Sequence, residues 1–134
     1  MKTKETLIDY WLKSAASDME VAGHLFEKGD YHYCLFFGHL VLEKALKALY
    51  VKNVNSNPPF KHSLPLLAEK GQLILTRDQE TFLEEVTDFN MEARYPDIKF
   101  SFYKKCTKEF TEKYLNQIKE FYQWLKTLIR SDRS

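Results

Sequence analysis

Apolar residues recur at every third or fourth position over long stretches of the chain, the spacing that lines one face of an α-helix. The first stretch predicts a helix over residues 6–28, with Thr6 and Asp9 as a capping box and Gly29 in the left-handed position after its end. A second helix follows Asp30, a candidate N-cap, and is apolar around most of its circumference. This helix either lies at the centre of the protein, or covers its own bundle with one face and a partner subunit with another.

The next part of the chain predicts a loop and two further helices. Asparagines and prolines over residues 53–62 oppose helix formation, so this segment is expected to be a loop. A short helix over residues 63–71 follows and ends at Gly71. Thr76 and Gln79 then form a capping box for a fourth helix, which a following proline ends near residues 92–93.

The last amphipathic stripe predicts one continuous helix over residues 103–129, and its aromatic residues are expected in the core. Long amphipathic helices joined mostly by short links bury their apolar stripes as antiparallel neighbours. The expected fold is therefore all-α, an up-and-down four-helix bundle with an additional short helix across one end. A chain of 134 residues fits a single domain, 1–134, with its helical core over about residues 6–129.

Composition and charge narrow the classes of partner. Twenty Lys and Arg residues against 19 Asp and Glu residues give a net charge of +1, so a nucleic acid would need a local basic patch. The most apolar stretch, residues 34–42, is much shorter than the roughly 20 residues that cross a bilayer, and we expect a soluble protein with no membrane partner. Cys34 and Cys106 lack paired spacing, which favours buried thiols in a reducing cytoplasm.

Several classes of active site have no counterpart in the sequence. The four glycines are too scattered for a phosphate loop or a dinucleotide fingerprint. No serine stands in a Gly-x-Ser-x-Gly turn, and no glutamate has a histidine three residues later, as di-metal helical bundles require. We therefore expect neither a cofactor nor a metal ion.

The segment Arg94-Tyr95-Pro96-Asp97 places a cation, an aromatic ring and a carboxylate at the end of the fourth helix. One interpretation is a corner that binds a phosphate or a partner, with a bidentate contact from Arg94 and a stacking surface from Tyr95. The other is structural: Pro96 ends the helix, Tyr95 packs, and Arg94 forms an ion pair with Asp97.

Three further residues allow a functional and a structural interpretation. Lys44 and Lys47 form either a cationic edge for a phosphate or an acidic partner, or solvated side chains over the apolar surface. His62 either contacts a ligand or caps the short helix. A second basic stretch, interleaved with glutamates, is typical of a solvated helix face; it contains Lys104, Lys105, Lys108 and Lys113.

Four segments carry a pattern in which order and spacing matter as much as the residues themselves. They are Trp11 with Ala15 and Asp18, the run from Glu43 to Leu49, His62-Ser63-Leu64, and Ala93-Arg94-Tyr95-Pro96-Asp97. This pattern resembles the HEPN domain family over about residues 6–129. The resemblance implies a helical up-and-down bundle, frequent dimerisation and, in prokaryotes, frequent pairing with a small nucleotidyltransferase. It also implies that some relatives are metal-independent ribonucleases or toxins, which use an arginine followed after four to six residues by a histidine.

That arginine and histidine motif is absent here. All four arginines lie C-terminal to His62, the last histidine, and the positions that the motif gives to histidine after Arg94 hold Lys99, Phe100 and Ser101. Cleavage of RNA through its 2′-hydroxyl needs a proton acceptor and a cation at the phosphate. We therefore expect a binding module that is not catalytic.

From the apolar second helix and the resemblance, we expect a homodimer, and from the unpaired cysteines a cytoplasmic one. From the resemblance, we expect that it accompanies a minimal nucleotidyltransferase in a toxin–antitoxin-like pair and binds a nucleotide or an RNA phosphate. The residues expected at its binding site are Arg94, Tyr95, Asp97, His62, Lys44 and Lys47. Two alternatives stay open. One is a metal-independent endoribonuclease with a displaced site, in which Arg94 holds the phosphate and His62 is the base. The other is a sensor that binds a mononucleotide at the end of the fourth helix and the Lys44 edge without reaction.

Overall fold

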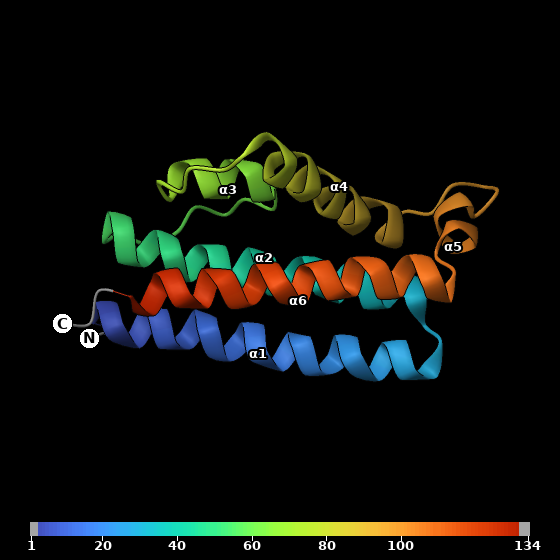
Figure 1. Cartoon of the computed structure of the whole chain (residues 1–134), viewed down its shortest axis with the longest axis horizontal. Helices are drawn as coiled ribbons and strands as arrows, with labels where there is room; N and C mark the ends of the chain where they lie inside the picture. The colour runs from blue at the N-terminus through green and yellow to red at the C-terminus, as the bar shows by residue number, and fades with distance from the viewer. Residues whose placement is uncertain (1–2, 132–134) are drawn as a thin grey trace.

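The computed structural model describes residues 3–131, and six helices account for most of that range (Figure 1). Four helices are long and two are short. In chain order they are α1 (Lys4–Lys28), α2 (Tyr31–Val54), α3 (Leu64–Lys70), α4 (Arg77–Arg94), α5 (Ser101–Lys105) and α6 (Lys108–Arg130). The long helices alternate in direction along the bundle, so the all-α, up-and-down architecture that the apolar pattern predicts is confirmed.

Helix α2 lies at the centre and packs against each of the other five helices. Its buried residues surround the whole helix axis, because α1, α6 and the layer of α3 and α4 each cover a different side (Figure 1). Of the two explanations for its apolar circumference, the central position is therefore the correct one. No partner subunit is needed to cover α2.

The helix starts differ from the prediction at two positions. The N-cap of α1 is Thr3, whose hydroxyl accepts a hydrogen bond from the Thr6 amide at 3.2 Å. The predicted capping box of Thr6 and Asp9 is therefore wrong, because an equivalent hydroxyl occurs three residues earlier. Asp30 does occupy the N-cap of α2, but its ψ of 66° is far from the extended value of 168° at Thr3, and its side chain makes no capping hydrogen bond.

Two other predicted helix ends are confirmed. Gly29 follows α1 in the left-handed conformation, with φ of 81°. The Thr76 hydroxyl accepts from the Gln79 amide while the Gln79 side chain accepts from the Thr76 amide, so the capping box of α4 is complete. Helix α3 lies against α2 and α4 beside the bundle (Figure 1), and not across its end as predicted.

The predicted continuous last helix is interrupted. Thr107 accepts a hydrogen bond from the Phe110 amide at 3.1 Å and so caps a new helix, which separates α5 from α6. The apolar stripe hides this break, since Phe102 and Cys106 before it are buried in the same core as the residues after it. The separation turns α5 toward the end of α4 (Figure 1).

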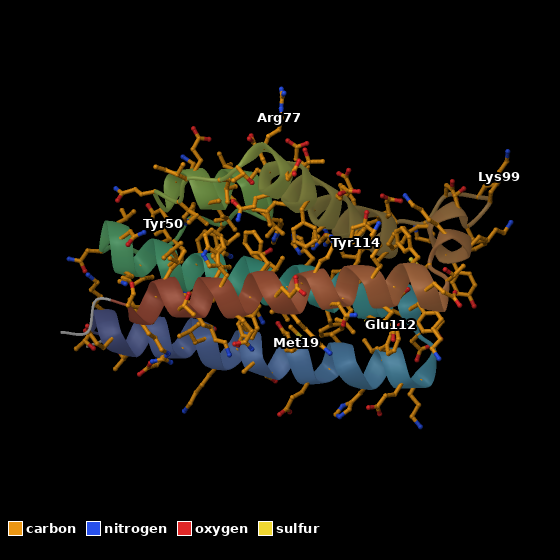
Figure 2. The ribbon with its side chains drawn as sticks, in the orientation of Figure 1. Met19, Tyr50, Arg77, Lys99, Glu112 and Tyr114 are labelled. Carbon is orange, nitrogen blue, oxygen red and sulfur yellow. The ribbon has the colours of Figure 1, made fainter. Side chains whose placement is uncertain are left out.

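The aromatic residues of α6 pack in the core as predicted. Tyr114, Phe121 and Tyr122 are buried, and Phe110 and Trp124 pack against the core while partly exposed. Tyr114 points from α6 toward α4 (Figure 2), where its hydroxyl donates to Glu85 at 2.7 Å. Burial raises the pKa of Tyr114 to about 12, so the phenol remains a hydrogen-bond donor at neutral pH.

Cys34 and Cys106 are buried free thiols, as expected from their spacing. Burial raises the pKa of each to about 12. Because only the thiolate is an effective nucleophile, these side chains act as packing groups. Within residues 3–131, no helix has the length and hydropathy needed to cross a membrane.

Gly38 of α2 faces Ile118 of α6: a Cβ atom at this position would lie 2.6 Å from Cδ1 of Ile118, so the end of this buried side chain would have to move. We expect Gly38→Ala to be about 1–3 kcal/mol less stable than Gly23→Ala in urea unfolding. Gly23 is the matched control: it is also inside a helix, a Cβ atom added to it would have nothing within 4 Å, and the substitution should gain roughly 0.5–1 kcal/mol from helix propensity.

A double variant tests the cause of this difference. Ile118→Val removes the methyl group that the new side chain would meet, so Gly38→Ala combined with Ile118→Val should be more stable than the sum of the two single effects. Equal stability changes at Gly38 and Gly23 would contradict the close packing of α2 on α6.

Candidate nucleotide pocket and buried polar network

Residues from the N-terminal end of α2, the C-terminal end of α4, helix α5 and the loop before it line a pocket of about 570 Å³. These elements lie together at one end of the bundle (Figure 1). Its lining combines several aromatic rings with both signs of charge. The polar and aromatic residues of the lining include His32, Tyr33, Glu92, Arg94, Tyr103 and Lys104. Volumes of roughly 300–1,000 Å³ are typical of small-molecule sites.

Arg94 is the sequence-predicted residue that this pocket contains. It is the last residue of α4, because Pro96 disfavours helical backbone at Tyr95. The guanidinium carbon lies 5.2 Å from the centroid of the Tyr95 ring, which supports it from outside the pocket. The helix thus ends one or two residues later than predicted, and it presents an exposed cation at the pocket.

Asp97 organises the start of α5. Its carboxylate accepts hydrogen bonds from the Ser101 amide at 2.8 Å and from the Ser101 hydroxyl at 2.7 Å. The hydrogen bond from the Ser101 amide is the main reason that the pKa of Asp97 is lowered. Among the described residues no ion pair joins Arg94 to Asp97, and Tyr95 is 66% exposed, so these two parts of the structural interpretation were wrong, whereas Pro96 does end the helix. Tyr95 and Asp97 line a smaller hollow of about 120 Å³ beside the main pocket.

An aromatic cluster forms one wall of the pocket. The His32 ring centroid lies 4.1 Å from that of Tyr33 and 5.0 Å from that of Tyr103. Burial lowers the pKa of His32, which favours the neutral imidazole. The apolar pattern did not predict this wall, because it placed Tyr103 in the core stripe, whereas this residue is 61% exposed on α5.

Two charged residues complete the lining. Lys104 was interpreted as part of a solvated helix face, yet it lies at the pocket because α5 is separate from α6. Glu92 is half-buried, and within residues 3–131 its side chain has no hydrogen bond or ion pair. Lys99, which stands at a position that the ribonuclease motif gives to histidine, instead points outward from the loop between α4 and α5 (Figure 2).

A buried polar network lies deeper, between α2 and the segments that cover it. His39 is completely buried, with Nε2 2.8 Å from the carbonyl oxygen of His62 and Nδ1 3.0 Å from Nδ2 of Asn90. Since a carbonyl only accepts and an amide nitrogen only donates, Nε2 carries the proton and Nδ1 accepts. Burial lowers the pKa of His39, which favours this neutral form.

The carboxylate of Glu43 forms the second half of the network. Its two oxygens lie 2.8 Å from Nδ1 of His62 and 3.1 Å from Nζ of Lys47. His62 therefore does not cap α3: Ser63 is the N-cap and accepts from the Leu66 amide at 3.3 Å. The imidazole of His62 instead attaches the preceding loop to α2, although 65% of its side chain is exposed.

The predicted cationic edge of α2 does not form. Lys47 is buried against Glu43 and lies 5.1 Å from the centroid of the Trp11 ring, so its interpretation as a solvated side chain was also wrong. Lys44 forms an ion pair with Asp18 at 2.7 Å. Each lysine is thus neutralised by a carboxylate that the fold places beside it.

The six residues expected at one site occupy separate places. Arg94 lines the main pocket, Tyr95 and Asp97 lie beside it, and the other three belong to the contacts of α2; these are His62, Lys44 and Lys47. In the described part of the chain no hydrogen bond or ion pair joins Arg94 to His62. Nor do three His, Cys, Asp or Glu side chains of that part converge as ligands for a metal ion.

The family model of the HEPN domain matches residues 8–128, and the chain belongs to this family. Among solved structures, TT1696 from Thermus thermophilus matches with a TM-score of 0.74 and 17% identity over 89% of this chain and 95% of its own. ST0689, described as an archaeal HEPN homologue, matches with a TM-score of 0.72 and 24% identity over 97% of this chain and 100% of its own. These two likenesses establish the fold. No curated protein matches the sequence.

The buried state of His39 predicts acid sensitivity. The pKa of His39 in the folded state lies below its ordinary value of 6.5, so below that pH the unfolded chain binds a proton that the folded chain does not. The contribution of the neutral His39 side chain to the free energy of unfolding should be fully present above pH 6.5, and it should fall as the pH drops from 6.5 toward the pKa of His39 in the folded state. Urea unfolding from about pH 7.5 to about pH 5.5 measures this slope.

His39→Gln removes the titrating group while keeping a donor and an acceptor, so its stability should depend less on pH over the same range. His24→Gln, at an exposed position of α1, is the control and should keep the wild-type slope. Identical slopes in wild type and His39→Gln would show that this histidine does not contribute.

Proposed function

We propose that the protein is a non-catalytic HEPN binding module that holds a nucleotide, or a phosphate and base of RNA, in the pocket formed by α2, α4 and α5. The observation that supports this proposal is that Arg94 and Lys104 share one cavity of about 570 Å³ with the aromatic cluster of His32 and Tyr103. A nucleotide has the two matching parts, an anionic phosphate and a flat base.

The chemistry of each part favours this assignment. A guanidinium offers two parallel N–H groups to phosphate oxygens, and an ammonium adds a point charge. Aromatic side chains stack on bases with about 1–3 kcal/mol per base. Because the net charge is only +1, this local set supplies the attraction that the whole molecule does not.

For the endoribonuclease alternative, the structure does not support His62 as the general base, but it offers His32 as another candidate. The imidazole of His62 is hydrogen-bonded to Glu43 and does not line the pocket. His32 does line it together with Arg94, and the neutral imidazole is the form that a general base requires. A cleavage assay therefore belongs to the test of the binding function.

Arg94→Ala should weaken the binding of ribonucleoside monophosphates at least about tenfold in isothermal titration calorimetry, because a charge-assisted contact to phosphate is lost. Arg77→Ala is the control, since Arg77 lies at the other end of α4 and points into solvent (Figure 2). If wild type binds none of the four nucleotides, or if Arg94→Ala binds them equally well, the proposed function is wrong.

RNA incubated with the protein and a metal chelator should stay intact. Cleavage that both Arg94→Ala and His32→Ala abolish would instead support the endoribonuclease alternative.

We also propose that the protein is a cytoplasmic homodimer and the companion of a minimal nucleotidyltransferase in a toxin–antitoxin-like pair. The nucleotidyltransferase partner follows from family membership alone. Large apolar side chains exposed in the last turn of α4 and in the segment after it support a protein contact there, among them Met91, Tyr95 and Ile98. The two buried free thiols suit a reducing compartment.

Light scattering should give about twice the chain mass of 15.9 kDa for the isolated protein, and a larger complex after co-expression with a neighbouring nucleotidyltransferase. Ile98→Asp should dissociate the dimer because Ile98 is 96% exposed in the segment between α4 and α5, whereas Ile74→Asp, at a position 92% exposed before α4, should not. A monomer at micromolar concentration counts against the dimer, and an unrelated neighbouring gene counts against the pairing.

A further inference from the structure

Glu92 is the one charged residue of the pocket that the proposed binding mode leaves without a role. It lies on α4 two residues before Arg94, and within the described chain its side chain has no hydrogen bond or ion pair. The residue is only partly buried, and its carboxylate oxygens are not among the buried side-chain atoms that lack a partner, so they remain accessible to solvent or to a ligand. The pocket therefore presents an acceptor that a ligand can satisfy.

The charges around Glu92 do not provide the carboxylate with an ion-pair partner. Burial raises its pKa, the positive charge of Lys105 opposes that shift, and the charges of Asp88 and Asp97 add to it. Lys105 is not within ion-pair distance, so the carboxylate oxygens keep their capacity to accept hydrogen bonds. N–H groups of a bound ligand would take the place of solvent at these oxygens.

We propose that the pocket selects guanine nucleotides, with the Glu92 carboxylate accepting hydrogen bonds from N1–H and the 2-amino group of the base while Arg94 holds the phosphate. This inference rests on the proposed function, since it assigns the base to a nucleotide site. It makes Glu92 the residue that determines specificity.

Guanine is the base whose donor pattern fits a carboxylate. Its Watson–Crick edge carries two adjacent donors, N1–H and the 2-amino group, which match the two oxygens of one carboxylate. In adenine and cytosine the amino group stands beside a ring nitrogen that only accepts, and in uracil the single N–H stands between two carbonyl oxygens. An anionic acceptor is repelled by each of those neighbouring acceptors.

The ring cluster gives the base a surface on which to lie. His32 and Tyr103 come from α2 and α5, with an angle of 61° between their planes. Since the His32 pKa is lowered, its ring is neutral at pH 7 and presents a face for stacking without adding a charge. A purine covers more of such a surface than a pyrimidine does.

Calorimetric titration with guanosine and inosine 5′-monophosphates tests the inference, because the two ligands differ only in the 2-amino group. Wild type should bind guanosine monophosphate about tenfold more tightly than inosine monophosphate, the factor expected for one hydrogen bond to a charged group. Uridine monophosphate should bind at least as weakly as the inosine nucleotide. Glu92→Gln should reduce the difference between the two purines to within about threefold.

Glu84→Gln is the matched control, because Glu84 is exposed on the same helix and outside the pocket, and it should keep the wild-type preference. Equal affinity of wild type for guanosine and inosine nucleotides overturns the guanine assignment. So does an equal loss of both ligands in Glu92→Gln. If nucleotides bind without base preference and Arg94→Ala abolishes that binding, the proposed function stands and only this inference fails; if no nucleotide binds, both fail.

Discussion

Glu43 is a buried acidic residue on α2, the helix that the other helices cover on every side. Removing a carboxylate from water is costly unless opposite charges and hydrogen bonds replace the hydration. Here Lys47, one turn further along α2, and His62, from the loop before α3, supply that replacement at 3.1 and 2.8 Å. The contact with this carboxylate attaches the end of the long loop to α2. It also positions the His62 carbonyl as the acceptor for His39.

The same network places α4. Asn90 donates to His39 from α4, so the helix that ends in Arg94 is attached to α2 one turn before its last residue. The wall of the pocket therefore depends on polar contacts in the core and not only on apolar packing. Acid that protonates His39 acts on this attachment as well as on stability.

The residues that carry the family resemblance divide into two groups once the fold is known. Trp11, Asp18, Lys44 and Lys47 contact one another or Glu43, and His62 joins the same set. These positions hold α1, α2 and the long loop together, so their shared pattern reflects the packing of the bundle. Only the segment around Arg94 reaches the pocket, where nearby residues outside the pattern supply the aromatic rings.

Local sequence patterns were sufficient to locate a helix where its apolar spacing and its capping residues lie close together along the chain. The three-and-four spacing and the paired Thr76 and Gln79 located the long helices, and the apolar circumference of α2 indicated its central position as one of two options. The break before α6 was missed because burial continues on both sides of it. An apolar stripe indicates which residues are buried, but it does not indicate whether the backbone between them is continuously helical.

By itself, the sequence determined the helical class, the antiparallel order of the long helices and, to within one or two residues, the end of α4, because these follow from spacing and from the restriction that proline imposes on the residue before it. Only the tertiary structure decided which charges are neutralised and which face a cavity. Lys44 and Lys104 are both lysines on predicted helices, and nothing in their local sequence distinguishes their roles. In the structure, Lys44 forms an ion pair with Asp18 of α1, whereas Lys104 lines a pocket with His32 of α2. Such partners come from distant parts of the chain, and the strength of a charge depends on what the fold places beside it.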